Sequence, residues 1–405
     1  MTATSEQVDT LLLFVCGALT LLVPFGLAFF VGGLGGRSTT SRAMKFALTG
    51  TAATILLGVA GGYGMLAGRP LLAHVLGAPS FDLAAGFGAA SHRPDLYALA
   101  KAGAILAAAS VSVAIVGVAV ASRITLRAWL VFTVLWSVLV LYPAGYAVFA
   151  LDDGWATGVL GVIDFGGALP IGVAAGAAAA GVILACGRGE HRPPERRSFP
   201  AIAIGGTLLW VGWLGLVVGS EGAVDSYTGL IAINAFLASA GGCLAWMVVD
   251  RVLLRRPTTV SALCGAFSGL VAITPAAGVL TVGWSLLLGA IAAVACATMV
   301  DLAARARFGA SMALIVIVTV ASMVGLLYLG LFAAGGGMVD SGNFDLFTAQ
   351  AIAGFSVLIG SFLVSVLVAL ALRFTVGLTR IRYRATSEPT PRRDRTTVPA
   401  GGAKD

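Results

Sequence analysis

The chain has 405 residues, of which 59% are hydrophobic and only 11% are charged. Soluble globular domains do not have this composition. It predicts a multi-pass membrane protein.

Eleven apolar runs are each long enough to cross a bilayer, which takes roughly 20 residues in a helix. They lie at 10–34, 44–67, 97–122, 128–151, 160–187, 200–220, 229–250, 259–274, 278–303, 309–333 and 347–374. Only the short stretch ITPAAG separates the eighth run from the ninth. The 54 glycines favour helices packed closely through small residues, so one tight bundle is expected rather than several domains.

The distribution of basic residues predicts the orientation of the chain, because Lys and Arg stay in cytoplasmic loops. All but three of the 25 basic residues fall in alternate loops and in the tail, and the exceptions are Arg69, Arg93 and Lys101. We therefore expect the N-terminus outside and the C-terminus in the cytoplasm. The net charge of +7 then reflects topology and contact with anionic lipid rather than nucleic-acid binding.

Processing, disulfide and cofactor signals are not found in the sequence. The first run lacks a basic leader and follows Glu6 and Asp9, so it is interpreted as the first span and not as a signal peptide. The five cysteines show no CxxC spacing, and the three histidines fall in loops, so no metal site and no cofactor are expected.

Few polar residues lie inside the runs, and they include Asp164, Asn234, Thr274 and Ser311. A membrane enzyme would need a nucleophile with a base, a metal cluster or paired carboxylates. No such group of residues is present, so the chain is not expected to be an enzyme. A Gly-rich bundle with an almost apolar interior favours a narrow passage for a small solute.

Several Gly-rich stretches carry a resemblance to a known family. They are PFGLAFFVGGLGGR (24–37), ASRI (121–124), DFGGALPIGVAAG (164–176), GWLGLVVGSEG (212–222) and SALCGAFSGLVAITPAAG (261–278). Together they resemble the ammonium transporter (Amt/Mep/Rh) family over nearly the whole chain. The resemblance implies an all-α fold of eleven transmembrane helices, two inverted halves of five plus a final helix, assembled as a homotrimer with one pore per subunit.

The resemblance assigns Asp164 to the family's inner aspartate, which is structural and stabilises the substrate. An alternative is that Asp164 only caps the fifth helix. The family has two histidines facing each other across the pore, and the corresponding positions here are Gly172 and Ser311. Both histidines are absent, so an altered, histidine-free pore is expected, in which Ser311 could offer one hydroxyl.

At the outer part of the pore, the resemblance assigns the cation-receiving serine to Ser220 and the cage tryptophan to Phe149, where cation–π attraction would replace lost hydration. The two stacked phenylalanines that close the family's pore fall on Ala108 and Leu216, so this gate is expected to be open or aliphatic. Trp213 also matches a family tryptophan.

Trp213 is interpreted mainly as a packing anchor. Thr274 and Pro275 match a TP element, which we interpret as a helix-breaking turn.

The last segment departs from the family. TVGL (375–378) resembles the start of its cytoplasmic region, but the following residues are basic and rich in Pro and Thr, which predicts disorder. A transmembrane domain at 1–375 and a cytoplasmic tail at 376–405 are predicted. Regulation by a PII-type partner is doubtful for this tail.

The leading functional hypothesis is a channel or transporter for ammonium or ammonia in the inner or plasma membrane. One alternative keeps the fold and passes another small solute. Another is a non-conducting sensor or scaffold. The expected partners are ammonium or ammonia, the lipid bilayer and further copies of the chain, with no nucleic acid.

Overall fold

The computed structural model describes residues 3–83, 95–187, 196–253, 256–306 and 309–378. Within these ranges, ten helices are long and apolar enough to cross a membrane, and the shorter apolar helix Thr259–Ile273 is the eleventh. The predicted all-α fold of eleven membrane helices is confirmed. The predicted tail from residue 379 onward lies outside the described residues.

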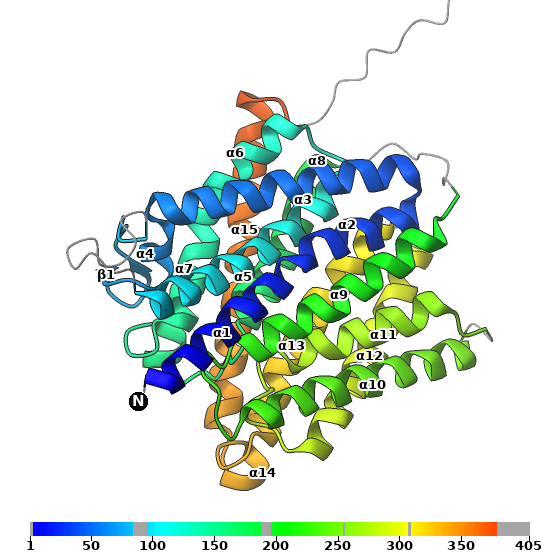
Figure 1. Ribbon diagram of the computed structural model, residues 1–405. Coiled ribbons are helices and arrows are strands. Elements are labelled where there is room, and N and C mark those ends of the chain that lie inside the picture. The colour runs from blue at the N-terminus through cyan, green and yellow to red at the C-terminus, as the bar shows by residue number, and fades with distance from the viewer. Residues whose placement is uncertain (1–2, 84–94, 188–195, 254–255, 307–308, 379–405) are drawn as a thin grey trace, which may run out of the picture.

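Four of the first five spans consist of helical pieces joined end to end, and the third is a single helix (Figure 1). They are α1 (Ala3–Thr20) with α2 (Leu22–Gly35); α3 (Arg37–Leu57) with the π-turn η1 (Gly58–Gly62) and α4 (Tyr63–Ala67); α5 (Leu96–Val120); α6 (Leu126–Trp136) with η3 (Ser137–Leu141) and α7 (Tyr142–Phe149); and η5 (Leu169–Val173) with α8 (Ala174–Cys186).

The other six spans are single helices. They are α9 (Phe199–Gly219), α10 (Thr228–Leu253), α11 (Thr259–Ile273), α12 (Val282–Arg305), α13 (Ala310–Phe332) and α15 (Asp345–Thr375). A one-turn helix, α14 (Met338–Ser341), precedes the last span, and the π-turn η4 (Trp155–Val159) follows α7.

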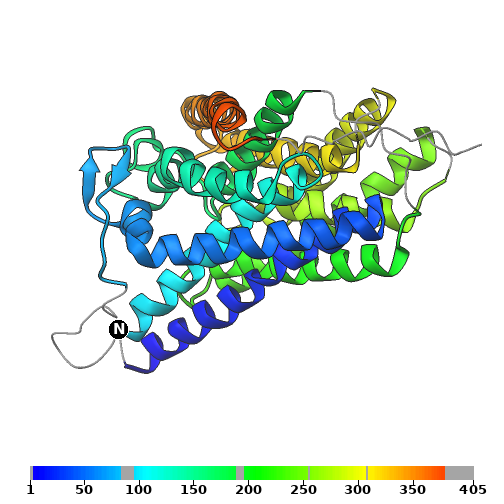
Figure 2. The same cartoon turned by 90° about the horizontal axis from the view of Figure 1, so that it is seen from above.

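The packing pairs of the first half recur in the second. Helix α3 contacts α5 and α6, and its counterpart α10 contacts α11 and α12. The two halves meet where α2 packs on α9 and where α8 packs on α13. Helix α15 lies along α8, on the face opposite α1 (Figure 2). This pairing fits two halves of five spans plus a final helix.

Glycine permits the close contact between α2 and α9. A Cβ built on Gly205 would lie 2.3 Å from the backbone nitrogen of Phe30, and one on Gly26 would lie 2.7 Å from that of Leu209. Any side chain at either position would force the helices apart, so the two halves are joined through bare backbone. Large apolar side chains such as Leu244 and Leu367 stay exposed on the outside, as a lipid-facing surface requires.

Two local features differ from the sequence-based expectation. The fifth helix begins at Leu169 and not at residue 160, because the preceding apolar stretch contains Gly161 and Gly167 at φ values of 70° and 76°. A two-stranded hairpin, β1 (Pro70–Leu72) with β2 (Leu76–Gly77), interrupts the all-helical pattern in the loop after α4. Hydropathy alone identifies neither feature, since both depend on backbone angles and turns.

Candidate functional site

Two non-helical segments meet inside the bundle, one before the fifth span (160–168) and one after the eighth (274–281). The backbone nitrogen of Phe165 donates to the carbonyl of Pro275 at 3.1 Å, and that of Gly166 donates to the carbonyl of Thr274 at 2.9 Å. Broken backbone at membrane depth is tolerated only where it is buried in protein or lines a cavity. We call this contact the junction; it is the candidate site.

Asp164 lies at the junction and is only 6% exposed. Its two carboxylate oxygens accept backbone N–H bonds from Ala168 at 2.6 Å and from Leu169 at 2.8 Å. Among the described residues it forms no ion pair. The carboxylate therefore caps the fifth helix at its N-terminus, where the helix dipole also favours negative charge.

Two buried amides hold the free carbonyls of the broken segments. Asn234 of α10 donates from Nδ2 to the carbonyls of Ala277 and Leu280, at 2.9 and 2.8 Å. Gln350 of α15 donates from Nε2 to the carbonyl of Ile163 at 2.8 Å. Both side chains are completely buried. Each irregular segment is thus fixed by one amide from a neighbouring span.

Trp213 joins α9 to the junction. Its Nε1 donates to the hydroxyl of Thr274 at 2.9 Å, and that hydroxyl donates to the carbonyl of Leu270 at 2.9 Å. The indole also packs edge-on against Phe267, with ring centroids 5.1 Å apart. Trp213 and Thr274 are each 1% exposed. This is the geometry of a packing anchor.

Phe149 and Ser220 lie at the C-terminal ends of their helices, α7 and α9. The Phe149 ring is so close to the backbone of Gly167 that a Cβ there would lie 2.8 Å from Cζ. Ser220 donates its hydroxyl to the carbonyl of Leu216, one turn earlier, at 2.8 Å. The serine oxygen can still accept a bond from a solute.

The two positions that the resemblance assigns to the family's phenylalanine gate are both in the apolar core. Ala108 is 9% exposed on α5, and Leu216 is 5% exposed on α9. A small and an aliphatic side chain therefore occupy these positions.

The structure does not bring Gly172 and Ser311 together. Ser311 lies at the start of α13, whereas Gly172 packs against Ser322, eleven residues or roughly 16 Å further along that helix. A Cβ on Gly172 would lie 1.9 Å from Oγ of Ser322 and 2.9 Å from the carbonyl of Val318. The sequence-based pairing of Gly172 with Ser311 is therefore not what the packing gives, because aligning on the FG pair at 308–309 misplaces α13 by about three turns.

Acidic groups gather at the end of the bundle that carries the N-terminus. Asp9 is 2% exposed and accepts the backbone N–H of Val224 at 2.7 Å. Tyr97 donates to the carbonyl of Gly222 at 3.2 Å. Burial, reinforced by the negative charge of Asp225 and a hydrogen bond with it, raises the pKa of Glu221 to about 7. The loop beside Ser220 therefore changes charge near neutral pH.

The hairpin is tied to the loop after Phe149 at the same end. His74 donates its backbone N–H to a carboxylate oxygen of Asp153 at 3.1 Å, and Tyr146 donates its hydroxyl to the same oxygen at 2.7 Å. The Tyr146 bond, followed by the His74 bond, lowers the pKa of Asp153. The carboxylate thus stays ionised and holds the two loops together.

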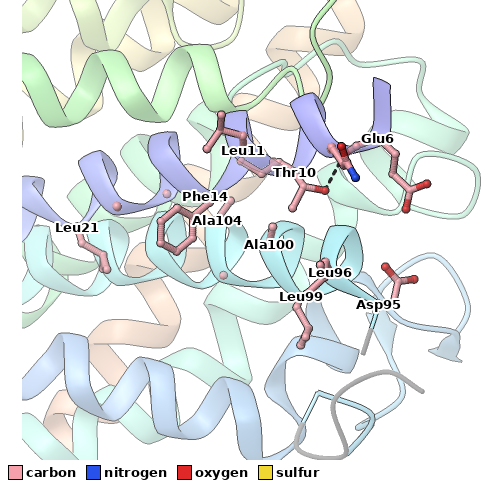
Figure 3. A pocket seen from close by; sticks show the side chains of 15 residues that line it. Glu6, Thr10, Leu11, Phe14, Leu21, Asp95, Leu96, Leu99, Ala100 and Ala104 are labelled. Carbon is pink, nitrogen blue, oxygen red and sulfur yellow. Dashed lines mark hydrogen bonds between the residues drawn. The ribbon is translucent and has the colours of Figure 1, made fainter. Parts of the chain in front are cut away.

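An apolar groove of about 1000 Å³ lies between α1 and α5, away from the junction. Leu11 and Phe14 of α1 and Leu99 and Ala104 of α5 are among the residues that line it, with Glu6 and Asp95 at one end (Figure 3). It shares no residue with the candidate site.

Comparison with known proteins decides the family. The sequence profile of the Ammonium Transporter Family matches residues 11–389. The chain belongs to this family. An ammonium transporter of Mycobacterium tuberculosis is 30% identical over 408 residues, covering 91% of this chain and 85% of that protein. A putative ammonium transporter of Methanothermobacter thermautotrophicus is also 30% identical, covering 91% and 93%.

Solved structures of the Ammonium Transporter Family agree with the fold. The crystal structure of Mep2 from Candida albicans is similar at a TM-score of 0.82 and 25% identity, covering 93% of this chain and 87% of that chain. A structure described as a sensor Amt protein has a TM-score of 0.83 at 20% identity, which supports the fold alone. The predicted family is confirmed, and the chain is a multi-pass membrane protein of a transporter family and not an enzyme.

Sequence reasoning missed two residues of the site. Gln350 is a lone amide in the apolar run 347–374. A polar residue inside a span indicates a structural or functional role, so the sequence carries a signal for it. Ser322 gives no comparable signal, since a serine among Val, Ala and Met is common in helices that pack closely. Its importance comes only from its contact with Gly172.

Proposed function

We propose that this chain moves ammonium, or ammonia after deprotonation, through a path in each subunit. The observation that carries the proposal is Asp164, a buried carboxylate at the junction of two broken spans in a chain of the Ammonium Transporter Family. An intramembrane carboxylate without an ion pair lends negative potential to its surroundings, and a passing cation gains from that potential.

The acidic end supplies an entrance. Asp9 and Glu221 lie near Ser220, whose hydroxyl oxygen retains a free lone pair for an ammonium N–H. Phe149 offers an aromatic ring close to Gly167. Clustered negative charge raises the local concentration of a cation and lowers that of anions.

The centre of the proposed path differs from the family pattern. At Gly172 no side chain is available to accept a proton, and aliphatic residues occupy the two gate positions, Ala108 and Leu216. These two departures favour a second candidate, a passage of the same fold for another small neutral or cationic solute.

The proposed setting is the inner or plasma membrane, with the N-terminus outside and the C-terminus in the cytoplasm. The basic residues Arg42 and Arg123 lie with Leu378 at the end opposite Asp9: Arg42 bonds to the carbonyl of Ile124, and Thr125 bonds to the carbonyl of Leu378. A basic cytoplasmic end follows the positive-inside tendency. A homotrimer is a further part of the proposal, based on the family resemblance, and the basic tail makes regulation by a PII-type partner doubtful.

The test uses the purified full chain in liposomes. Ammonium-dependent current and internal pH are recorded, and influx of ammonium, methylammonium, urea and CO₂ is compared in the same vesicles. Transport of ammonium and methylammonium above empty liposomes supports the leading proposal. Selective passage of urea or CO₂ supports the second candidate, and no flux of any solute leaves only a non-conducting sensor or scaffold.

A further inference from the structure

The first span carries a buried carboxylate that reaches the loop after α9 (221–225). Helix α1 packs on α9 through glycine, since a Cβ on Gly219 would lie 2.6 Å from that of Cys16. Asp9 precedes Cys16 by about two turns, so it lies roughly 10 Å closer to the end of the bundle that carries the N-terminus, beyond the last turn of α9. There its Oδ1 accepts the backbone N–H of Val224 at 2.7 Å.

Two further spans hold the same loop. Tyr97 of α5 donates its hydroxyl to the carbonyl of Gly222 at 3.2 Å. Thr228, at the start of α10, donates to the carbonyl of Ala223 at 3.4 Å. Gly222 has a φ of 77°, which lets the chain turn sharply after α9. Together with the bond to Asp9, these contacts tie the loop to α1, α5 and α10.

A carboxylate at position 9 needs a physical reason. Asp9 is only 2% exposed, and aspartate is almost never so buried unless it is paired. Within the described part of the chain it forms no ion pair, and its partner Val224 is 45% exposed. The N–H of an exposed residue can bind water equally well. The bond to Asp9 therefore does not rescue a buried donor, and its effect is to fix where the loop lies.

We infer that Asp9 is a positioning residue, which through the loop 221–225 fixes Ser220 in the orientation that receives the cation. Ser220 ends α9, and its backbone N–H and its hydroxyl both bond to the carbonyl of Leu216. The end of a helix opens easily unless its neighbours hold it. The bond between Asp9 and Val224, four residues after Ser220, keeps this last turn closed. The inference rests on the proposed function and assigns the fixing of its entrance to the first span.

A positioning role at the entrance affects how strongly the solute first binds and not how fast the rest of the path carries it. A fixed hydroxyl binds at no further cost in ordering, whereas a mobile one must be ordered at the moment of binding. Loss of the Asp9 bond should therefore raise the KM for methylammonium and leave the maximal rate unchanged. A purely structural defect has the opposite pattern, because it lowers the number of working molecules and leaves the KM of the others unaltered.

The test measures the initial rate of labelled methylammonium influx against its concentration, in liposomes that contain the full-length protein. Asp9→Ala removes the acceptor, and we expect the KM to rise about two- to tenfold, the range for one hydrogen bond. Asp9→Asn keeps an oxygen for the N–H of Val224 and should keep the KM of the wild type. Tyr97→Phe removes the second bond to the loop and should raise the KM over the same range.

A double mutant tests whether Asp9 acts through Ser220. Ser220→Ala removes the receiving hydroxyl and should raise the KM by itself. If this serine is the group that Asp9 positions, Asp9→Ala should add nothing to the KM of the Ser220→Ala protein, because the effects of coupled residues are not additive.

Thr10→Val is the matched control. Thr10 follows Asp9 on α1, but its hydroxyl donates to the carbonyl of Glu6 at 2.7 Å, within the same helix (Figure 3). The substitution removes a polar group next to Asp9 while keeping the shape of the side chain. It should leave both the KM and the maximal rate unchanged.

The outcomes are distinct. A raised KM for Asp9→Ala and Tyr97→Phe, a normal KM for Asp9→Asn and no added effect in the Ser220→Ala protein support the inference. An active wild type whose KM stays the same in Asp9→Ala and Tyr97→Phe overturns it and leaves the proposed function intact. Equal impairment of Asp9→Asn and Asp9→Ala, or additivity with Ser220→Ala, does the same.

If Asp9→Ala does not fold, the KM of Tyr97→Phe decides between these outcomes by itself. A wild-type protein that moves neither ammonium nor methylammonium overturns both the inference and the proposed function.

Discussion

The indole of Trp213 donates to the hydroxyl of Thr274, so a side chain of the sixth span is tied to the turn that ends the eighth. The backbone carbonyl of Thr274 also accepts a hydrogen bond from the N–H of Gly166. Thr274 therefore links three spans through its hydroxyl and its carbonyl.

We expect Trp213→Phe and Thr274→Val each to lower the free energy of unfolding, and the effects to be non-additive. Either change alone removes the bond, so the coupling in a double-mutant cycle should be about 0.5–1.5 kcal/mol. The measurement is reversible unfolding in detergent. Trp210→Phe is a useful comparison, because its indole donates to Ser239 at 2.8 Å and not to Thr274. Full additivity between Trp213 and Thr274 would contradict the link.

Asp164→Ala should destabilise the protein far more than Asp95→Ala. Both carboxylates cap a helix, but Asp95 is exposed, so the backbone N–H of Ala98 can donate to water when the carboxylate is removed. Loss of Asp164 leaves two buried N–H groups unpaired, each at about 1–3 kcal/mol, whereas loss of an exposed cap costs about 1 kcal/mol. Thermal unfolding of the two variants checks the difference. Equal melting temperatures would show that water reaches the Asp164 cap.

Gly172→Ala should destabilise the protein and stop transport. The added methyl group would meet both the side chain of Ser322 and the carbonyl of Val318, and such overpacking costs about 1–3 kcal/mol. Gly360→Ala is the matched control in the middle of α15, where nothing lies within 4 Å, and it should be about 0.5–1 kcal/mol more stable than wild type. A Gly172→Ala protein as stable as wild type would refute the close contact with Ser322.

Glu221 should make transport depend on external pH near 7. Its pKa is raised from 4.5 to about 7, so the side chain is neutral well below pH 7 and ionised above it. The native state is therefore favoured, relative to the unfolded chain, at low pH and loses this advantage as pH rises through 7. Above pH 7 the entrance gains one negative charge, and cation influx should rise.

Influx of methylammonium measured between pH 5.5 and 8 tests this dependence, and Glu221→Gln should remove the rise. Glu6→Gln removes a carboxylate from the same end of the bundle but leaves the Glu221 loop intact, so it should keep the rise. A Glu221→Gln profile identical to wild type would assign the pH dependence to another group.

Most of the fold could be predicted from sequence because each span is a long apolar run. The interruptions of these runs were harder to predict. Apolar residues continue from 160 to 168, yet glycines with positive φ end the helical geometry there, and no count of hydrophobic residues detects this. The hairpin after α4 is equally hidden, since its strands are only three and two residues long.

The candidate site was only partly predictable. Asp164, Trp213 and Thr274 are identified by motif, and the structure brings Trp213 to Thr274 and Thr274 to the segment that contains Asp164. The packing partner of Gly172 is not identified from the sequence, because it depends on which turn of α13 packs against the fifth span. Hydropathy does not fix the register between two smooth apolar helices, and only the packed structure identifies Ser322.

The last span also affects how the protein assembles as it is made. Gln350 binds the carbonyl of Ile163, and Ser361 binds that of Ala174 at 2.6 Å, so both bonds join residues 187 positions apart. During synthesis these two carbonyls lack the side-chain donors Gln350 and Ser361 until the eleventh span enters the bilayer. A chain that ended after α13 would contain every helix of the two halves but would lack the two hydrogen bonds from α15 to Ile163 and Ala174. Formation of these contacts to the fifth span is therefore coupled to the end of translation.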